Sequence, residues 1–279
     1  MNKPFPSERP VNTARERLRR VEGRHNTLLK ELRGAFARAD LTEAGDCAIE
    51  GLRIVEEAIR SGLRFRAVFF RESASNLVER LLPQIGAHVE TVVLPDKLFA
   101  SSVPSETPQG VAALVHYRQN SLEDVFSRLE LGPVVVVAGL QDPGNLGTIL
   151  RSAEAFGGAG VLLGEGTVSP FNPKVVRGSA GSMFRLSVMR VKLADVLPQL
   201  REGGVRLIAT SSHKGTPLPQ ANLAGPVAVM IGGEGAGVPR DLLARVDEVV
   251  VIPHAEQLES LNAGVAASIV LYESRRQRS

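Results

Sequence analysis

The stretch Val134-Val-Val-Val-Ala-Gly-Leu-Gln-Asp-Pro-Gly-Asn-Leu-Gly-Thr-Ile-Leu-Arg-Ser-Ala-Glu-Ala-Phe-Gly157 decides the fold of the second half of the chain. Its four consecutive valines are typical of a strand that is covered on both faces, as in a parallel sheet. A turn with proline and glycine follows. Apolar residues then recur at helical spacing, at Leu146, Ile149, Leu150 and Ala153. The stretch therefore predicts a strand, a loop and a helix, the repeating unit of an α/β domain.

The same alternation continues to the end of the chain. Short apolar runs predict further strands at residues 161–163, 186–189, 205–209, 227–231 and 249–252. Helical patterns separate most of these runs, and a last helix is expected over residues 261–274. We therefore expect residues 133–279 to form an α/β domain built on a parallel sheet.

The first half of the chain has shorter elements. Helical spacing predicts helices over residues 12–40, with a break at Gly23, and over residues 52–59 and 77–82. Apolar runs predict strands at residues 67–70, 89–94 and 111–116, and a short apolar piece lies at residues 47–49. These patterns indicate a smaller α/β domain over residues 12–117. The polar residues 1–11 are expected to be a disordered lead, and residues 118–132 a linker.

Composition sets broad limits on function. The 279 residues are 43% hydrophobic and 23% charged, which is ordinary for a globular chain of about two domains. The net charge of +3 permits a nucleic-acid partner without requiring one. The single cysteine, Cys47, excludes an internal disulfide and favours a reducing, cytoplasmic location. No metal-ligand spacing and no apolar stretch of about 20 residues occur, so no metal site and no membrane span are expected.

Three strand-to-helix junctions carry the candidate chemistry, because ligands of open parallel sheets bind beyond the carboxyl ends of the strands. In the first junction, Asn145 is the expected N-cap of the helix. Arg151 and Glu154 lie three residues apart, so they are either functional groups or a solvent-exposed ion pair.

The second junction is Ile231-Gly-Gly-Glu-Gly-Ala-Gly-Val-Pro239. Its four glycines let the backbone approach a ligand closely, although a plain tight turn would use them as well. The spacing is neither the G-x-G-x-x-G of dinucleotide-binding folds nor a phosphate loop with G-K-S or G-K-T. The carboxylate of Glu234 would also repel a pyrophosphate, whereas a neutral or positive ligand would suit it.

The third junction runs from Ile252 to Ser268. Ser260 is the expected N-cap of the last helix, and Asn262 lies in its first turn. The run Ala263-Gly-Val-Ala-Ala267 is unusually small for the start of a helix. Small residues there indicate close packing on backbone or on a ligand.

Together the three junctions resemble the SpoU (TrmH) family of the SPOUT methyltransferase superfamily. The residues that match its motifs are Asn145, Gly147, Ile149, Arg151, Ala153, Phe156, Gly157, Gly232, Glu234, Gly237, Ile252, Pro253, Ser260, Leu261, Asn262 and Ala266. The segment Pro170-Phe-Asn-Pro-Lys-Val-Val-Arg-Gly-Ser179 resembles the segment that links the first two motifs. In the first half, Glu50-Gly-Leu-Arg-Ile-Val-Glu-Glu-Ala58 and Thr107-Pro-Gln-Gly110 resemble an RNA-binding domain of the ribosomal-protein L30e type.

The resemblance implies an S-adenosylmethionine-dependent RNA 2′-O-ribose methyltransferase whose C-terminal domain contains a deep trefoil knot. It implies a homodimer, formed through the last helix unless that helix only covers the sheet. By motif, the cofactor-binding residues are Thr210, Gly232, Ile252 and Leu261. The L30e-like extension favours 23S ribosomal RNA over transfer RNA as the substrate.

The resemblance also assigns roles at the reaction centre. A guanidinium resists deprotonation, so we expect Arg151 to clamp a substrate phosphate or stabilise the alkoxide, and the general base stays open. The residues expected to orient Arg151 and the substrate are Asn145, Glu234, Ser260 and Asn262. Lys174 and Arg177 either bind RNA phosphates or are simply solvated.

Two alternatives from other classes remain at this point. One is a catalytically inactive RNA-binding protein of the same fold, against which the presence of Arg151, Glu234 and Asn262 speaks. The other is a nucleotide-dependent oxidoreductase of the Rossmann type, which the missing dinucleotide fingerprint disfavours.

Overall fold

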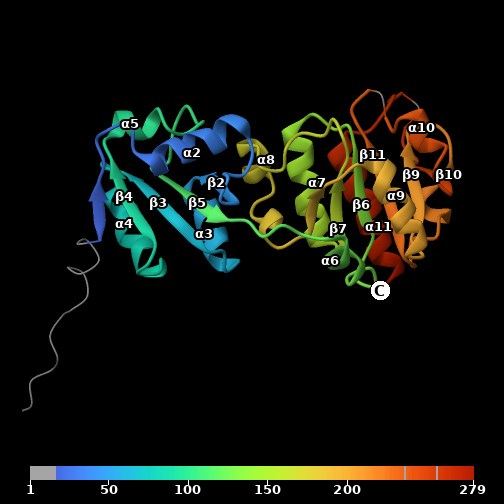
Figure 1. The fold of residues 1–279 in the computed structure, drawn as a ribbon. Coiled ribbons are helices and arrows are strands. Elements are labelled where there is room, and N and C mark those ends of the chain that lie inside the picture. Colours follow the sequence, from blue (N-terminus) through green and yellow to red (C-terminus); the bar gives the residue numbers. More distant parts are fainter. Residues whose placement is uncertain (1–16, 236, 256) are drawn as a thin grey trace, which may run out of the picture. The chain divides into compact units, whose positions relative to one another are not determined.

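The computed structural model describes residues 17–235, 237–255 and 257–279 (Figure 1). The chain divides into two compact units, Met1–Tyr117 and Arg118–Ser279. The lead predicted over residues 1–11 lies outside the described residues.

The first unit is built on a mixed five-stranded sheet with the order β1-β4-β3-β5-β2. Its strands are β1 (Leu18–Arg20), β2 (Asp46–Glu50), β3 (Phe65–Arg71), β4 (Glu90–Leu94) and β5 (Val111–His116). Its helices are α2 (Thr27–Arg38), α3 (Leu52–Arg60), α4 (Ser75–Leu81) and α5 (Asp96–Ala100), with a 3₁₀ turn at η1 (Leu82–Gln84). One buried cluster joins α2 and α5 to the sheet through Leu29, Leu32, Phe69, Phe99 and Leu114. The small α/β domain expected from the sequence is therefore present.

The beginning of this unit differs from the prediction. A helix was expected from residue 12, but Leu18–Arg20 is an edge strand that pairs in parallel with β4. The backbone of β1 forms hydrogen bonds with β4, and an ion pair joins Arg19 of β1 to Glu90 of β4. Helix α2 starts only after Asn26, whose side chain accepts a hydrogen bond from the Leu29 amide at 3.3 Å. Three residues are too few to show a period, so helical spacing across this segment was misleading.

The second unit contains a seven-stranded sheet with the order β10-β12-β9-β11-β6-β7-β8, in which every pairing is parallel. Its strands are β6 (Val134–Ala138), β7 (Gly160–Leu163), β8 (Val188–Arg190), β9 (Arg206–Ser211), β10 (Thr216–Pro217), β11 (Val227–Gly232) and β12 (Glu248–Val251). Every residue of β6, β7 and β11 is buried. This confirms the parallel sheet that the valine run predicted.

Helices of the second unit connect and cover these strands. They are α6 (Leu122–Phe126), α7 (Pro143–Ala155), α8 (Pro173–Gly178), α9 (Leu193–Glu202), α10 (Arg240–Leu243) and α11 (Ala263–Gln277), with 3₁₀ turns η2 (Ser182–Phe184) and η3 (Leu218–Gln220). In the sheet, strand β12 lies between β9 and β10. In the sequence, β11 comes between β12 and these two strands. A trefoil knot stays a prediction from the family resemblance.

The stretch expected to be a linker is folded into the second unit. Helix α6 begins with a capping box, in which Ser121 and Asp124 exchange side-chain and backbone hydrogen bonds. Val125 and Leu129 are buried in the same cluster as Val134. Most residues around this apolar pair are polar, so composition alone predicted a linker here.

Helices α7 and α8 cross at two glycines. A Cβ atom on Gly147 would lie 2.8 Å from the Cα of Gly178, so no larger residue fits without moving a backbone. This contact explains physically why a glycine follows Asn145 by two residues. It also brings the segment of Lys174 and Arg177 against the helix that carries Arg151.

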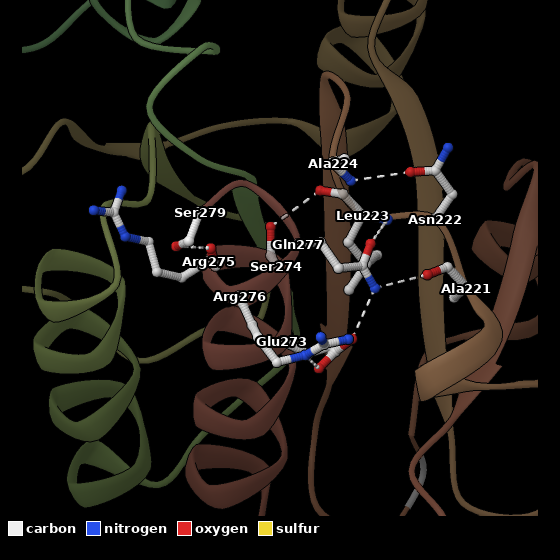
Figure 2. Close-up of polar contacts among 10 residues, drawn as sticks. All are labelled: Ala221, Asn222, Leu223, Ala224, Glu273, Ser274, Arg275, Arg276, Gln277 and Ser279. Atoms are coloured by element: carbon white, nitrogen blue, oxygen red, sulfur yellow. Dashed lines mark hydrogen bonds and ion pairs between the residues drawn. The ribbon is translucent and has the colours of Figure 1, made fainter.

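The end of α11 is fastened to the segment between η3 and β11 (Figure 2). The Gln277 side chain accepts from the Leu223 amide at 2.7 Å and donates to the Ala221 carbonyl at 2.9 Å. The Ser274 hydroxyl donates to the Leu223 carbonyl at 3.2 Å. Hydrogen bonds from Arg276 and then Gln277 lower the pKa of Glu273 to about 2, so this carboxylate stays ionised near neutral pH.

Candidate active site

A cavity of about 350 Å³ lies at the carboxyl ends of β9, β11 and β12. Segments that follow these three strands line it, together with the start of α11. All four residues that the sequence suggested for the cofactor are among its walls, namely Thr210, Gly232, Ile252 and Leu261. Three loops that are distant in sequence therefore meet at one edge of the sheet.

The glycine loop after β11 folds back on itself. The amide of Gly237 donates to the carbonyl of Gly233 at 3.0 Å, and a Cβ atom on Gly232 would overlap the backbone of Gly237 and Val238. Gly235 and Gly237 have φ values of 78° and 64°, which side chains disfavour. The glycines therefore form a tight turn and, at the same time, bring bare backbone to the cavity wall.

The third junction begins directly after β12, with Ile252. Asn262, and not Ser260 as predicted, is the N-cap of α11, since its side chain accepts from the Val265 amide at 3.2 Å. Ser260 is exposed and lines the cavity, as Asn262 does. The small residues of this helix start let it pack closely, because a Cβ on Gly264 would lie 3.0 Å from the Cβ of Thr148 in α7.

His254 also lines the cavity, and the sequence analysis did not single it out. Its Nδ1 lies 2.8 Å from the Ile252 carbonyl oxygen and its Nε2 lies 3.1 Å from the Leu258 carbonyl oxygen. The imidazole thus bridges the loop that leads from β12 to Ser260. The only sequence signal was its place after Ile-Pro in the third motif.

The first two motifs are joined by a side-chain hydrogen bond. The Asn145 amide donates to the carboxylate of Glu234, which is exposed at the cavity, while Asn145 itself is only 8% exposed. Asn145 is not the helix N-cap that was predicted. Asp142 is the N-cap, and its side chain accepts a hydrogen bond from the backbone N–H of Asn145 at 2.7 Å. Pro143 suits the first helical position, so the cap is the residue before it.

Arg151 lies on α7 with its side chain exposed, and it is not among the residues of the cavity wall. Within the described part of the chain it forms no hydrogen bond or ion pair. The predicted alternative of a pair with Glu154 is wrong, because Glu154 is bound by Arg185, whose Nη2 lies 3.0 Å from its Oε2. That hydrogen bond lowers the pKa of the Glu154 carboxyl.

Helix α11 runs alongside α7 next to Arg151. The hydroxyls of Ser152 and Ser268 lie 2.7 Å apart, and the rings of Phe156 and Tyr272 meet edge to face at 5.8 Å between centroids. Helices α7 and α11 therefore pack side by side, and Arg151 is an exposed residue of this helix pair.

Lys174 and Arg177 are both exposed on α8 and take no part in the cavity wall. Asn172 caps this short helix by accepting from the backbone amide of Lys174 at 2.9 Å. Among the described residues no group of histidine, cysteine or carboxylate side chains is arranged to hold a metal ion. No described helix combines the length and the apolar composition that a membrane crossing requires.

Comparison with known families matches residues 132–272 to the SpoU rRNA Methylase family and residues 26–113 to the MRM3-like substrate binding domain. The first match spans the sheet, the cavity and most of α11. The second spans most of the first unit.

Individual relatives match over nearly the whole chain. The 23S rRNA (guanosine(2553)-2′-O)-methyltransferase RlmP of Bacillus subtilis is 31% identical over 92% of this chain and 100% of its own length. The solved SpoU methyltransferase AviRb of Streptomyces viridochromogenes, in complex with AdoMet, is 27% identical with a TM-score of 0.78, covering 91% of this chain and 98% of AviRb. A solved RNA 2′-O ribose methyltransferase is 30% identical with a TM-score of 0.76, covering 93% and 99%.

Proposed function

Because the chain belongs to the SpoU rRNA methylase family and is an S-adenosylmethionine-dependent RNA 2′-O-ribose methyltransferase, we propose that its substrate is 23S ribosomal RNA. The proposal rests on the relative from Bacillus subtilis, which matches over both units and is named for that RNA. Because this match includes the substrate-binding unit, we infer the substrate as well as the reaction from the relative. A cytoplasmic site of action follows from such a substrate.

The cofactor occupies, on this proposal, the cavity walled by Thr210, Gly232, Ile252 and Leu261. The residues present fit it, because the glycine loop packs on itself too tightly to admit a side chain at Gly232 and so presents bare backbone at the cavity wall. The nearby carboxylate of Glu234 favours a positively charged sulfonium over a phosphate. When bound, the cofactor supplies an electrophilic methyl group.

The reaction forms a bond between a ribose oxygen and the methyl carbon and breaks the bond between that carbon and sulfur. The hydroxyl proton must leave, since a neutral ribose hydroxyl is a weak nucleophile. We assign Arg151 to the substrate phosphate or the developing alkoxide, where its fixed positive charge stabilises the transition state. Glu234, held by Asn145, and the polar groups of Ser260 and Asn262 orient the substrate. The base that takes the proton is not assigned.

We also propose that the chain is a homodimer joined through the exposed face of α7 and α11, so that Arg151 acts at an interface. Val265 and Tyr272 on α11 are 46% and 56% exposed, which leaves apolar surface of this helix uncovered. A dimer would cover this surface and add groups of the partner beside Arg151.

Light scattering tests the dimer. The wild-type protein is expected to have twice the chain mass, whereas Val265→Asp combined with Tyr272→Asp is expected to be monomeric and poorly active, because two carboxylates would be buried in the interface. The control is Leu131→Asp, a change at another exposed apolar residue, outside both helices, that should leave the dimer intact. A monomeric wild-type protein with full activity would exclude this part of the proposal.

The substrate is tested with unmethylated 23S rRNA and unmethylated transfer RNA, incubated separately with the protein and labelled S-adenosylmethionine. We expect label in 23S rRNA at a single alkali-resistant linkage, because a 2′-O-methyl group blocks cleavage of the adjacent backbone bond. Label only in transfer RNA would replace the proposed substrate. No transfer to either RNA, with normal cofactor binding, would support the alternative of an inactive RNA-binding protein.

A further inference from the structure

A second depression, called here the β7–β8 groove, lies at the carboxyl ends of β7 and β8 and has a volume of about 490 Å³. Its polar lining comes from Glu165, Thr167, Ser169, Arg190 and Lys192. None of these residues belongs to the three motifs or lines the cofactor cavity. The function proposed above therefore assigns no role to the groove.

Arg190 is held in a fixed place in this groove. Its guanidinium carbon lies 5.7 Å from the centroid of the Phe171 ring, and its Nη2 donates to the Ser169 hydroxyl. Phe171 is only 9% exposed, so it anchors the guanidinium against the body of the unit. A planar guanidinium with five N–H donors suits the oxygens of a phosphate, and a pre-positioned one loses less entropy on binding.

The charges of the groove favour an anion. Lys192 is exposed at its rim, so two cations face one carboxylate, that of Glu165. Glu165 accepts a hydrogen bond from the Leu193 amide at 3.2 Å, at the first residue of α9. The backbone N–H groups of Glu165 and Leu193 lower the pKa of this carboxyl. The carboxylate is thus bound to a helix end, which offsets part of its charge.

The floor of the groove is connected to the active site by direct contacts. The Thr167 hydroxyl accepts from the Gly139 amide at 3.2 Å, and the Val168 amide donates to the Leu140 carbonyl at 2.8 Å. On its other side, Gly139 meets the glycine loop, since a Cβ on Gly233 would lie 2.7 Å from the Gly139 carbonyl oxygen. Gly233 directly precedes Glu234. One loop therefore separates the groove from the proposed reaction centre, along the same edge of the sheet.

We propose that the β7–β8 groove binds a backbone phosphate of the RNA strand next to the methylated nucleotide, with Arg190 and Lys192 as its ligands. The proposal rests on the proposed function, because it extends the same substrate along the sheet edge. A polyanion that enters the active site must continue over one of the neighbouring surfaces, and this one presents fixed positive charge. Phosphate contacts position a nucleic acid and make its binding salt-dependent.

The test compares wild-type protein with Arg190→Gln and Lys192→Gln, using a transcript of unmethylated 23S rRNA as the probe. Filter binding over a series of salt concentrations gives the slope of log affinity against log salt. Each variant is expected to bind about tenfold more weakly at 0.1 M salt, with a slope smaller by about 0.7–0.9. The KM for RNA should rise about as much, with kcat within about twofold, because a contact to a phosphate outside the reacting ribose holds substrate and transition state equally.

Arg245→Gln is the matched control, because Arg245 is exposed and lies before the amino end of β12, at the opposite edge of the sheet. Lys192 is exposed, so its variant tests the charge of the groove even where Arg190→Gln disturbs the packing of Phe171. If both groove variants match Arg245→Gln in salt slope and KM, the groove proposal is overturned. Wild-type protein that transfers no methyl group to RNA would instead overturn the proposed function, and the groove proposal with it.

Discussion

Replacement of Arg151 by alanine is expected to lower kcat by about a thousandfold and to leave the affinity for S-adenosylmethionine within a few fold. The reason is geometric and electrostatic. Arg151 is not part of the cavity wall, so its loss removes no cofactor contact. Its exposed guanidinium has no internal partner within the described residues, so the charge is available to the substrate.

Single-turnover methyl transfer to 23S rRNA measures this effect, and calorimetry measures cofactor binding. Arg151→Lys is expected to recover only a small part of the rate, since an ammonium keeps the charge but loses the planar fork. Arg245→Ala serves as the matched loss of an exposed arginine and should retain full activity. A large loss of cofactor affinity in Arg151→Ala would show that its proposed role is wrong.

Replacement of Gly232 by alanine is expected to weaken S-adenosylmethionine binding by about a hundredfold or more. The added Cβ would overlap the backbone of Gly237 and Val238, and neither neighbour is a flexible side chain that could move away. The loop must shift by the size of a methyl group, and about 3 kcal/mol of strain corresponds to roughly a hundredfold in affinity. Calorimetric titration with S-adenosylmethionine is the direct measurement.

Gly225→Ala is the control for this change, because a Cβ at that glycine would meet nothing within 4 Å. Its cofactor affinity and thermal unfolding should equal those of the wild type. Thermal unfolding without cofactor separates the two consequences of Gly232→Ala, since a local loop shift leaves the melting temperature nearly unchanged. Normal cofactor affinity in Gly232→Ala would mean that the glycine loop is not the binding wall.

The two predictions depend on features that the sequence revealed to different extents. Gly232 was expected in the cofactor wall from its motif, and it lies in the wall of the cavity. Arg151 was expected beside the same loops; it is exposed on α7 and is not part of the cavity wall, and its role stays a prediction. The motif gave the residue but not the direction of its side chain, which depends on how α7 packs against α8 and α11.

The caps show the same division. The sequence placed Asn145 and Ser260 at helix starts, while the structure has Asp142 and Asn262 there. Each error is a shift of two or three residues among several good capping residues. A shift of this size leaves the helix correct and changes the role of the side chain, since Asn145 is thereby released to bind Glu234.

By itself the sequence determined the alternation of strands and helices, the parallel sheet of the second unit and the family motifs, because these depend on local periodicity and on burial along one segment. Only the tertiary structure decided that β12 inserts beside β9, that Leu18–Arg20 forms an edge strand, that Asn145 meets Glu234 and that Arg190 rests on Phe171. These features join residues that are far apart in the chain, up to 89 positions for Asn145 and Glu234. Such contacts follow from the packing of whole elements against one another, and no local pattern carries that information.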